Sequence, residues 1–131
     1  MKSFQLYFLS VLRNNYANFT GRASLKQYWM FVLYLFVAFL LAALLDNLLG
    51  LTFSEVAPYG WIYSSLGLFT TIPQLGLLVR RLHDVGKSGW YYFIVCIPLV
   101  GAILLVVALA KKGDAEENKY GAAPIEEVAE R

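Results

Sequence analysis

The residues best able to do chemistry lie at 80–90, which read Arg-Arg-Leu-His-Asp-Val-Gly-Lys-Ser-Gly-Trp. Five ionisable side chains, including the single histidine, fall within eight positions here, and long apolar runs lie on either side. Charge next to hydrocarbon is costly unless it is paired, hydrated or bound to a ligand. We therefore expect any functional site to include this segment.

One interpretation of the segment is structural. If the preceding helix continues through it, Asp84 can pair with Arg80 at i, i+4, with Arg81 at i, i+3, or with both. Gly86 then suits the end of that helix, and Ser88 suits the cap of the next one. This pattern predicts a tight, charge-paired turn that needs no ligand.

The same residues also suit an anion site at headgroup depth. Guanidinium groups match phosphate geometry, and backbone N–H groups at a helix N-terminus add donors. A histidine there changes charge near neutral pH. The ligand would be a phospholipid headgroup or a phosphorylated partner. The candidate residues are Arg22, Arg80, Arg81, His83, Lys87 and Ser88.

Other chemistries fit this segment poorly. Gly86-Lys87-Ser88 imitates the end of a P-loop, but Arg81 stands where that motif needs glycine. A single histidine with no second His or Cys nearby does not predict a zinc site. His83 and Asp84 are adjacent, so they point in different directions on a helix, and no nucleophile stands out. We expect no catalytic residue, cofactor, metal or nucleic-acid partner.

The elements that position this segment are three uncharged apolar runs at 28–45, 56–79 and 90–110. About 20 apolar residues span a bilayer core. The chain is 59% hydrophobic and 15% charged, whereas soluble domains are about a quarter charged. We predict an all-α integral membrane protein with three transmembrane helices. It forms one membrane domain over 1–124, and a flexible acidic tail follows at 125–131.

A short amphipathic helix is expected before the first run. Its apolar residues recur with helical spacing, and they are Phe4, Tyr7, Phe8, Val11 and Leu12. Such a helix lies on the inner leaflet or packs on the transmembrane bundle, and the sequence leaves both possibilities open. Ser24 and Gln27 form a possible capping box where the first run begins.

The distribution of Lys and Arg predicts orientation. With three crossings and the N-terminus inside, seven of these residues are cytoplasmic and four are external. The positive-inside rule therefore favours a cytoplasmic N-terminus and 80–89 loop, with an external tail. Lys111 and Lys112 fit that tail poorly. Pro98 and Gly101 would allow a re-entrant third segment, which returns the tail to the cytoplasm, but three full crossings are our default.

A set of short motifs resembles a known family. They are Gly-Arg-Ala-Ser at 21–24 with Tyr-Trp at 28–29, the 80–90 segment, Pro-Leu-Val-Gly at 98–101, and Gly113, Asn118, Tyr120, Gly121 and Pro124. They resemble a family of small bacterial inner-membrane proteins, domain of unknown function eight hundred and five, which includes YhaH-type proteins. The resemblance covers roughly 4–124. Leu-Lys-Gln at 25–27 departs from the usual, more basic stretch.

The resemblance implies an inner-membrane location and one helical domain, and it brings no established activity. It also implies that the tail belongs with the 80–90 segment. If the two pack together, both lie on one membrane face, against our default of an external tail. The structural residues it implies are Gly21, Trp29, Asp84, Gly86, Gly89, Trp90, Asn118, Tyr120 and Gly121.

Together these patterns predict a non-enzymatic interaction or anionic-lipid-binding module that uses the 80–90 segment. Its expected partners are membrane lipids, with a second copy or another membrane protein as further candidates. The alternative is an oligomeric transporter or channel, or an accessory subunit of a transport complex. Three helices alone are too few to enclose a pore. A polar path would have to use Pro73, Gln74 or the small residues Ser64, Ser65 and Gly67.

Overall fold

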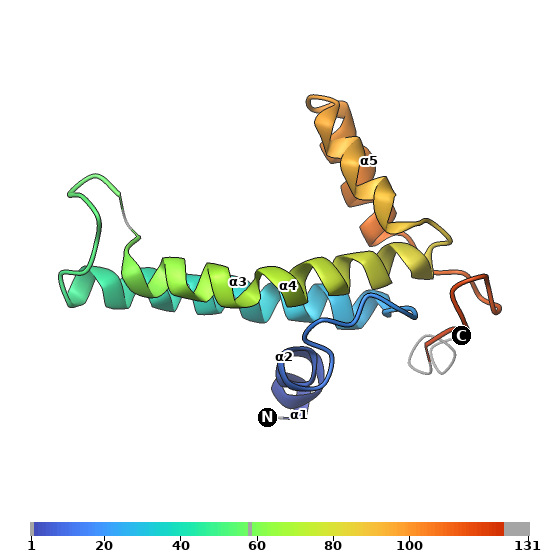
Figure 1. Ribbon diagram of the computed structural model, residues 1–131, viewed down its shortest axis with the longest axis horizontal. Helices are drawn as coiled ribbons and strands as arrows, with labels where there is room; N and C mark the ends of the chain where they lie inside the picture. Colours follow the sequence, from blue (N-terminus) through green and yellow to red (C-terminus); the bar gives the residue numbers. More distant parts are fainter. Residues whose placement is uncertain (1, 58, 125–131) are drawn as a thin grey trace.

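The computed structural model describes residues 2–57 and 59–124, and every regular element in these ranges is helical (Figure 1). The only β pairing among the described residues is two isolated bridges. The elements are α1 (Lys2–Phe4), η1 (Gln5–Leu9), α2 (Ser10–Arg13), α3 (Leu25–Leu48), α4 (Trp61–Asp84), η2 (Gly89–Cys96) and α5 (Val100–Ala110).

Two long helices, α3 and α4, run side by side along the molecule (Figure 1). Each has 24 residues, which corresponds to about 36 Å at 1.5 Å per residue. Both are long and apolar enough to cross a membrane. The predicted run 28–45 lies inside α3. The predicted run 56–79 is displaced, because α4 begins only at Trp61 and continues to Asp84.

The N-termini of both long helices are held by polar groups. Ser24 caps α3, and its side chain accepts the backbone N–H of Gln27 at 3.0 Å, as the capping box predicts. The cap of α4 comes from the other helix, where the buried Asp46 accepts three backbone N–H groups, those of Gly60, Ile62 and Tyr63, at 2.8–3.0 Å. A carboxylate at a helix N-terminus satisfies orphan donors and complements the helix dipole.

The N-terminal helix packs on the bundle through its apolar face. The ring of Phe8 stacks on Phe31 with centroids 5.3 Å apart, and Phe4 meets Tyr34 edge-on. Val11 is fully buried in the same cluster as Leu77 of α4. The sequence left open whether this helix lies on the inner leaflet or packs on the bundle, and in the structure it packs on the bundle. Figure 1 shows α1 and α2 crossing the long helices.

The prediction of one continuous helix over 90–110 is wrong. The segment is a hairpin made of η2, a break at 97–99, and the 11-residue α5. Pro98 disfavours helical geometry at the residue before it, and Ile97 is extended. Leu99 has a positive φ of 60°. Gly101 packs so closely on the Ile94 carbonyl that a Cβ there would collide with it.

The hairpin projects from the end of α4 at a steep angle to the long helices (Figure 1). At 1.5 Å per residue α5 is about 16 Å long, roughly half of a bilayer core. Its base packs in a second cluster with Leu78 and Leu82 of α4. Because the chain turns back at 97–99, residues 111–124 return to the end of α4.

Candidate functional site

Three buried charged side chains lie together at the C-terminal end of α4. Asp84 Oδ1 accepts Arg22 Nε at 2.8 Å, and Asp84 Oδ2 accepts Arg81 Nη1. All three side chains are at most 1% exposed. We call Arg22, Arg81 and Asp84 the charged staple. It contains two cations and one anion, and the remaining guanidinium donors are directed to backbone carbonyls.

Arg81 holds the end of the hairpin. Its Nε donates to the Leu109 carbonyl and its Nη2 to the Lys111 carbonyl. These are orphan acceptors at the C-terminus of α5, where a cation also complements the helix dipole. Arg81 Nη1 additionally donates to the Ala23 carbonyl at 3.0 Å. Trp29 Nε1 supports the same junction through Leu109 at 3.1 Å.

Arg22 holds the tail. It donates to the carbonyls of Asp114, Glu116 (2.9 Å) and Gly121 (3.2 Å). Tail residues then close over the last turn of α4. Asn118 Nδ2 donates to the His83 carbonyl at 3.0 Å, and Tyr120 stacks on the His83 ring with centroids 3.9 Å apart.

Two glycines are required by this packing. Gly86 has a φ of +80° and ends α4, and the N–H groups of Gly86 and Lys87 bond the carbonyls of His83 and Leu82. This is the C-terminal motif that favours glycine. Gly113 lies against the Asp84 carboxylate, where any Cβ would collide with its oxygens.

The structural interpretation therefore holds for Arg81 and Asp84, with two corrections. Arg80 does not pair with Asp84; its Nε instead donates to the Asn18 carbonyl at 3.1 Å. Ser88 occupies the position before η2 without a capping bond from its side chain. The donors of Arg22 and Arg81 face inward, to the Asp84 carboxylate and to backbone carbonyls.

The other residues predicted from the sequence also lie near the end of α4, some in its packing and some on its surface. Gly21 accepts His83 Nδ1 through its carbonyl at 2.9 Å. Gly89 packs on Val79, and Lys87 lies over the Tyr91 ring at 4.5 Å. Trp90 is 78% exposed, and its ring stacks on Phe93.

Two contacts that hold these elements in place were not predicted from the sequence. Asp46 caps α4, and an acid that directly follows an uncharged run was the available signal. The Asn18 carbonyl receives Arg80, and nothing in the sequence points to that contact.

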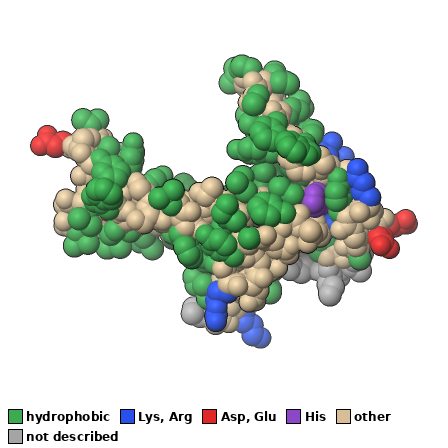
Figure 2. All heavy atoms as spheres, viewed as in Figure 1, with side chains coloured by type: hydrophobic (Ala, Val, Ile, Leu, Met, Phe, Trp, Pro, Cys, Tyr) green, Lys and Arg blue, Asp and Glu red, His purple; other side chains and the backbone are tan. Residues whose placement is uncertain are grey.

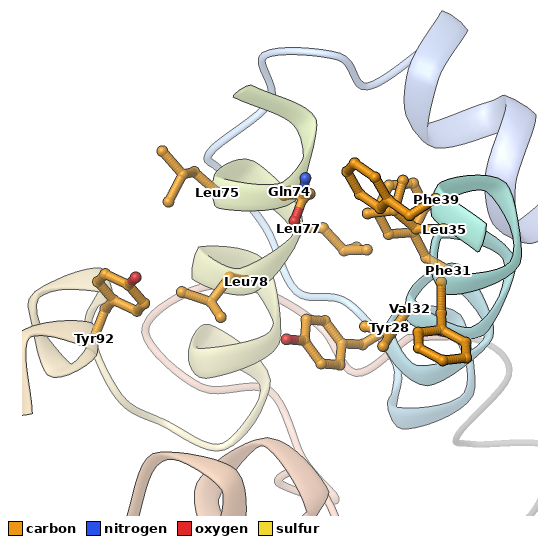
Figure 3. Close-up of a pocket in the computed structure, with 11 residues that line it drawn as sticks. Tyr28, Phe31, Val32, Leu35, Phe39, Gln74, Leu75, Leu77, Leu78 and Tyr92 are labelled. Carbon is orange, nitrogen blue, oxygen red and sulfur yellow. The ribbon is translucent and has the colours of Figure 1, made fainter. Parts of the chain in front are cut away.

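An apolar hollow lies away from the staple, between α3 and α4 (Figure 3). Its volume is about 320 Å³, and Figure 3 shows Leu77 and Gln74 facing Leu35 and Phe39, with Tyr92 of η2 across from them. Gln74 Nε2 donates to Thr70 Oγ1 at 3.0 Å within α4. Its amide is thereby engaged along its own helix, which does not favour a polar transport path in one chain.

A family model described as "protein of unknown function (DUF805)" matches residues 16–122. The chain belongs to this family. The family's description assigns no activity, and its match includes the whole charged staple and both long helices.

Two curated relatives extend the comparison. The chain is 33% identical over 118 residues to "inner membrane protein YhaH" of Escherichia coli (strain K12), covering 90% of this chain and 95% of the relative. It is 37% identical over 118 residues to "inner membrane protein YhaI" of the same organism, covering 90% and 94%. No solved structure matches. The relatives' names and the apolar helices agree on an inner-membrane protein.

Proposed function

We propose that this chain is a small non-enzymatic module of the bacterial inner membrane that binds anionic lipid headgroups at the cytoplasmic surface. One observation supports this function, the separation of charge along the folded chain. All Lys and Arg within the described residues lie in the N-terminal helix, the 14–26 segment, the end of α4 with the turn after it, or the tail. The opposite loop, 49–60, has no Lys or Arg and exposes Glu55.

The topology that we propose has two crossings and one re-entrant hairpin. The helices α3 and α4 cross, while η2 and α5 enter and leave on the side of the charged staple. Only one of the eleven Lys and Arg, Arg131, lies outside the described residues. The other ten are then cytoplasmic. Three full crossings place only seven Lys and Arg in the cytoplasm, so the topology with the hairpin agrees better with the positive-inside rule. Figure 2 supports this separation, since blue side chains gather at one end and beneath the N-terminal helix.

Headgroup binding is assigned to lysines that the fold leaves on the surface. We call Lys26, Lys87, Lys111 and Lys112 the lysine rim. Lys87 is half-buried over Tyr91, and the other three are exposed. Basic residues next to an anionic leaflet are attracted to it over about one Debye length. The staple, whose donors are already engaged, contributes rigidity to this surface instead.

The experiment is native mass spectrometry of the protein extracted gently from membranes that contain phosphatidylglycerol. We expect anionic lipid to remain bound to the wild type and to be largely lost when the four rim lysines are changed to Gln. A matched variant with all four changed to Arg keeps the charge and should keep the lipid. Equal retention in the Gln and Arg variants would remove the proposed headgroup function.

A further inference from the structure

Arg80 is buried like its neighbour Arg81, but one of its donors has no hydrogen-bond partner among the described residues. Its side chain belongs to a residue only 5% exposed, and its Nε donates to the Asn18 carbonyl. Its Nη2 is buried and has no hydrogen-bond partner among the described residues. Within the same ranges, both carboxylate ion pairs go to Asp84, from Arg22 and Arg81.

A buried guanidinium without a counter-charge is physically costly. Buried charges are retained in proteins when they are paired and hydrogen-bonded. The free donor of Arg80 therefore requires an acceptor, and an anionic oxygen satisfies both the hydrogen bond and the charge. Arg80 lies four residues before the end of α4, about 6 Å along the helix axis, which is headgroup depth when α4 spans the membrane.

The cover over Arg80 is the polar loop 14–22. It is attached to α4 by the Arg80–Asn18 bond, by the bond from Ala23 N–H to the Arg80 carbonyl (3.0 Å), and by the bond from Tyr16 to the Phe69 carbonyl. Gly76, one turn before Arg80, lets this loop approach, since a Cβ there would lie 2.8 Å from the Asn18 carbonyl oxygen. An anion bound at Nη2 would thus connect loop and helix.

We propose that Arg80 Nη2 binds one anionic oxygen at the junction of α4 and loop 14–22, supplied by the phosphate of an anionic phospholipid. This rests on the proposed headgroup function and names the residue that makes it specific. The lysine rim attracts the leaflet over a distance, whereas Arg80 makes the directional bond. A carboxylate offers the same chemistry, and the sequence supplies Glu126, Glu127 and Glu130 outside the described residues.

The test is hydrogen exchange of the full chain in phosphatidylcholine nanodiscs, with and without phosphatidylglycerol. In the wild type, phosphatidylglycerol should slow exchange at amides 15–20 about tenfold, the factor expected for one bond to a charged group. Arg80→Gln should abolish this slowing, and Arg80→Lys should keep part of it. The matched control is Arg13→Gln, which removes an exposed charge from the end of α2 and should leave the slowing intact.

Three further arms decide the source of the oxygen. Slowing that persists in Arg80→Gln overturns the proposal, and so does a wild type that responds equally to both nanodisc compositions. A triple Glu→Gln change at 126, 127 and 130 should leave the lipid response intact. If that change instead speeds exchange at 15–20 without added anionic lipid, and Arg80→Gln speeds it to the same extent, the acceptor is the chain's own carboxylate and the lipid assignment is wrong.

The same variants also separate the Arg80 site from the headgroup binding proposed for the lysine rim. If the rim variants lose phosphatidylglycerol while Arg80→Gln responds like the wild type, only the Arg80 site fails. If neither the rim variants nor Arg80→Gln changes lipid retention, both proposals fail. Far-ultraviolet circular dichroism of each variant shows whether the helices are intact, and Arg80→Lys carries the comparison if Arg80→Gln does not fold.

Discussion

At the scale of single residues, Asp84 has the largest structural effect that we expect. It accepts from two arginines, of which Arg81 lies three positions earlier and Arg22 lies 62 positions away. Desolvating three charges is expensive, and it is tolerated where every donor and acceptor is engaged. The backbone carbonyls around Arg22 and Arg81 complete that requirement. The staple therefore specifies one arrangement of loop, helix and tail.

Changing Asp84 to Asn should destabilise the protein by about 3–5 kcal/mol, the range for removing one partner of a buried ion pair. Two buried guanidinium groups then lose their shared counter-charge. Thermal unfolding in detergent, followed by circular dichroism, measures this effect. The matched control is Asp114→Asn, because Asp114 is exposed and accepts a single side-chain bond, from Asn118. Similar midpoints for the two variants would contradict the role given to Asp84.

At the scale of elements, each end of the α3–α4 pair has its own polar connection. The staple joins four segments at one end, and Asp46 joins α3 to the start of α4 at the other. Gly60 permits the second connection, because its backbone lies against Leu51 where a Cβ would collide. The register of the two helices is thus determined at both ends.

Changing Asp46 to Ala should loosen the first turn of α4. Three backbone N–H groups lose their acceptor, and we expect the amides of residues 60–63 to exchange at least about fivefold faster. Hydrogen exchange by mass spectrometry reports this locally. Glu55→Ala is the control, since that acid is exposed in the same loop. Unchanged exchange in Asp46→Ala would mean that the cap does not hold α4.

At the scale of the whole molecule, the hairpin of η2 and α5 decides which end of the long helices the tail meets. Because the chain turns back at 97–99, the tail meets both Arg22, which precedes the start of α3, and His83, near the end of α4. These two residues are far apart in sequence but lie at one end of the molecule. A tail on the far side of the membrane is incompatible with these bonds. The proposed topology follows from this contact together with the charge distribution.

Labelling of single cysteines tests that topology. In a Cys96→Ser background, we expect a membrane-impermeant maleimide to label Ser54→Cys from outside intact cells. Lys2→Cys and Ala115→Cys should react only after the membrane is opened. These two sites, which the proposed topology places in the cytoplasm, serve as controls for each other, because they must behave alike. Labelling of Ala115→Cys from outside would restore three full crossings and contradict the hairpin topology.

The sequence by itself predicted two long apolar helices, the family, the Ser24 cap and the glycine end of α4. Each of these depends on local composition or on residues within one or two turns. Uncharged runs of this length have few other stable environments. Local sequence also identified Asp84 and one of its partners, Arg81.

Only the tertiary structure decided which other charge meets Asp84, what Arg80 does, and where the tail lies. Arg80 and Arg81 are alike in type, but successive residues on a helix are rotated by about 100°, so one faces Asn18 and the other faces the end of α5. Arg22, Gly113 and Asn118 reach the same place from distant positions. Their contacts depend on the chain reversal at Leu99, a backbone geometry that local preferences disfavour.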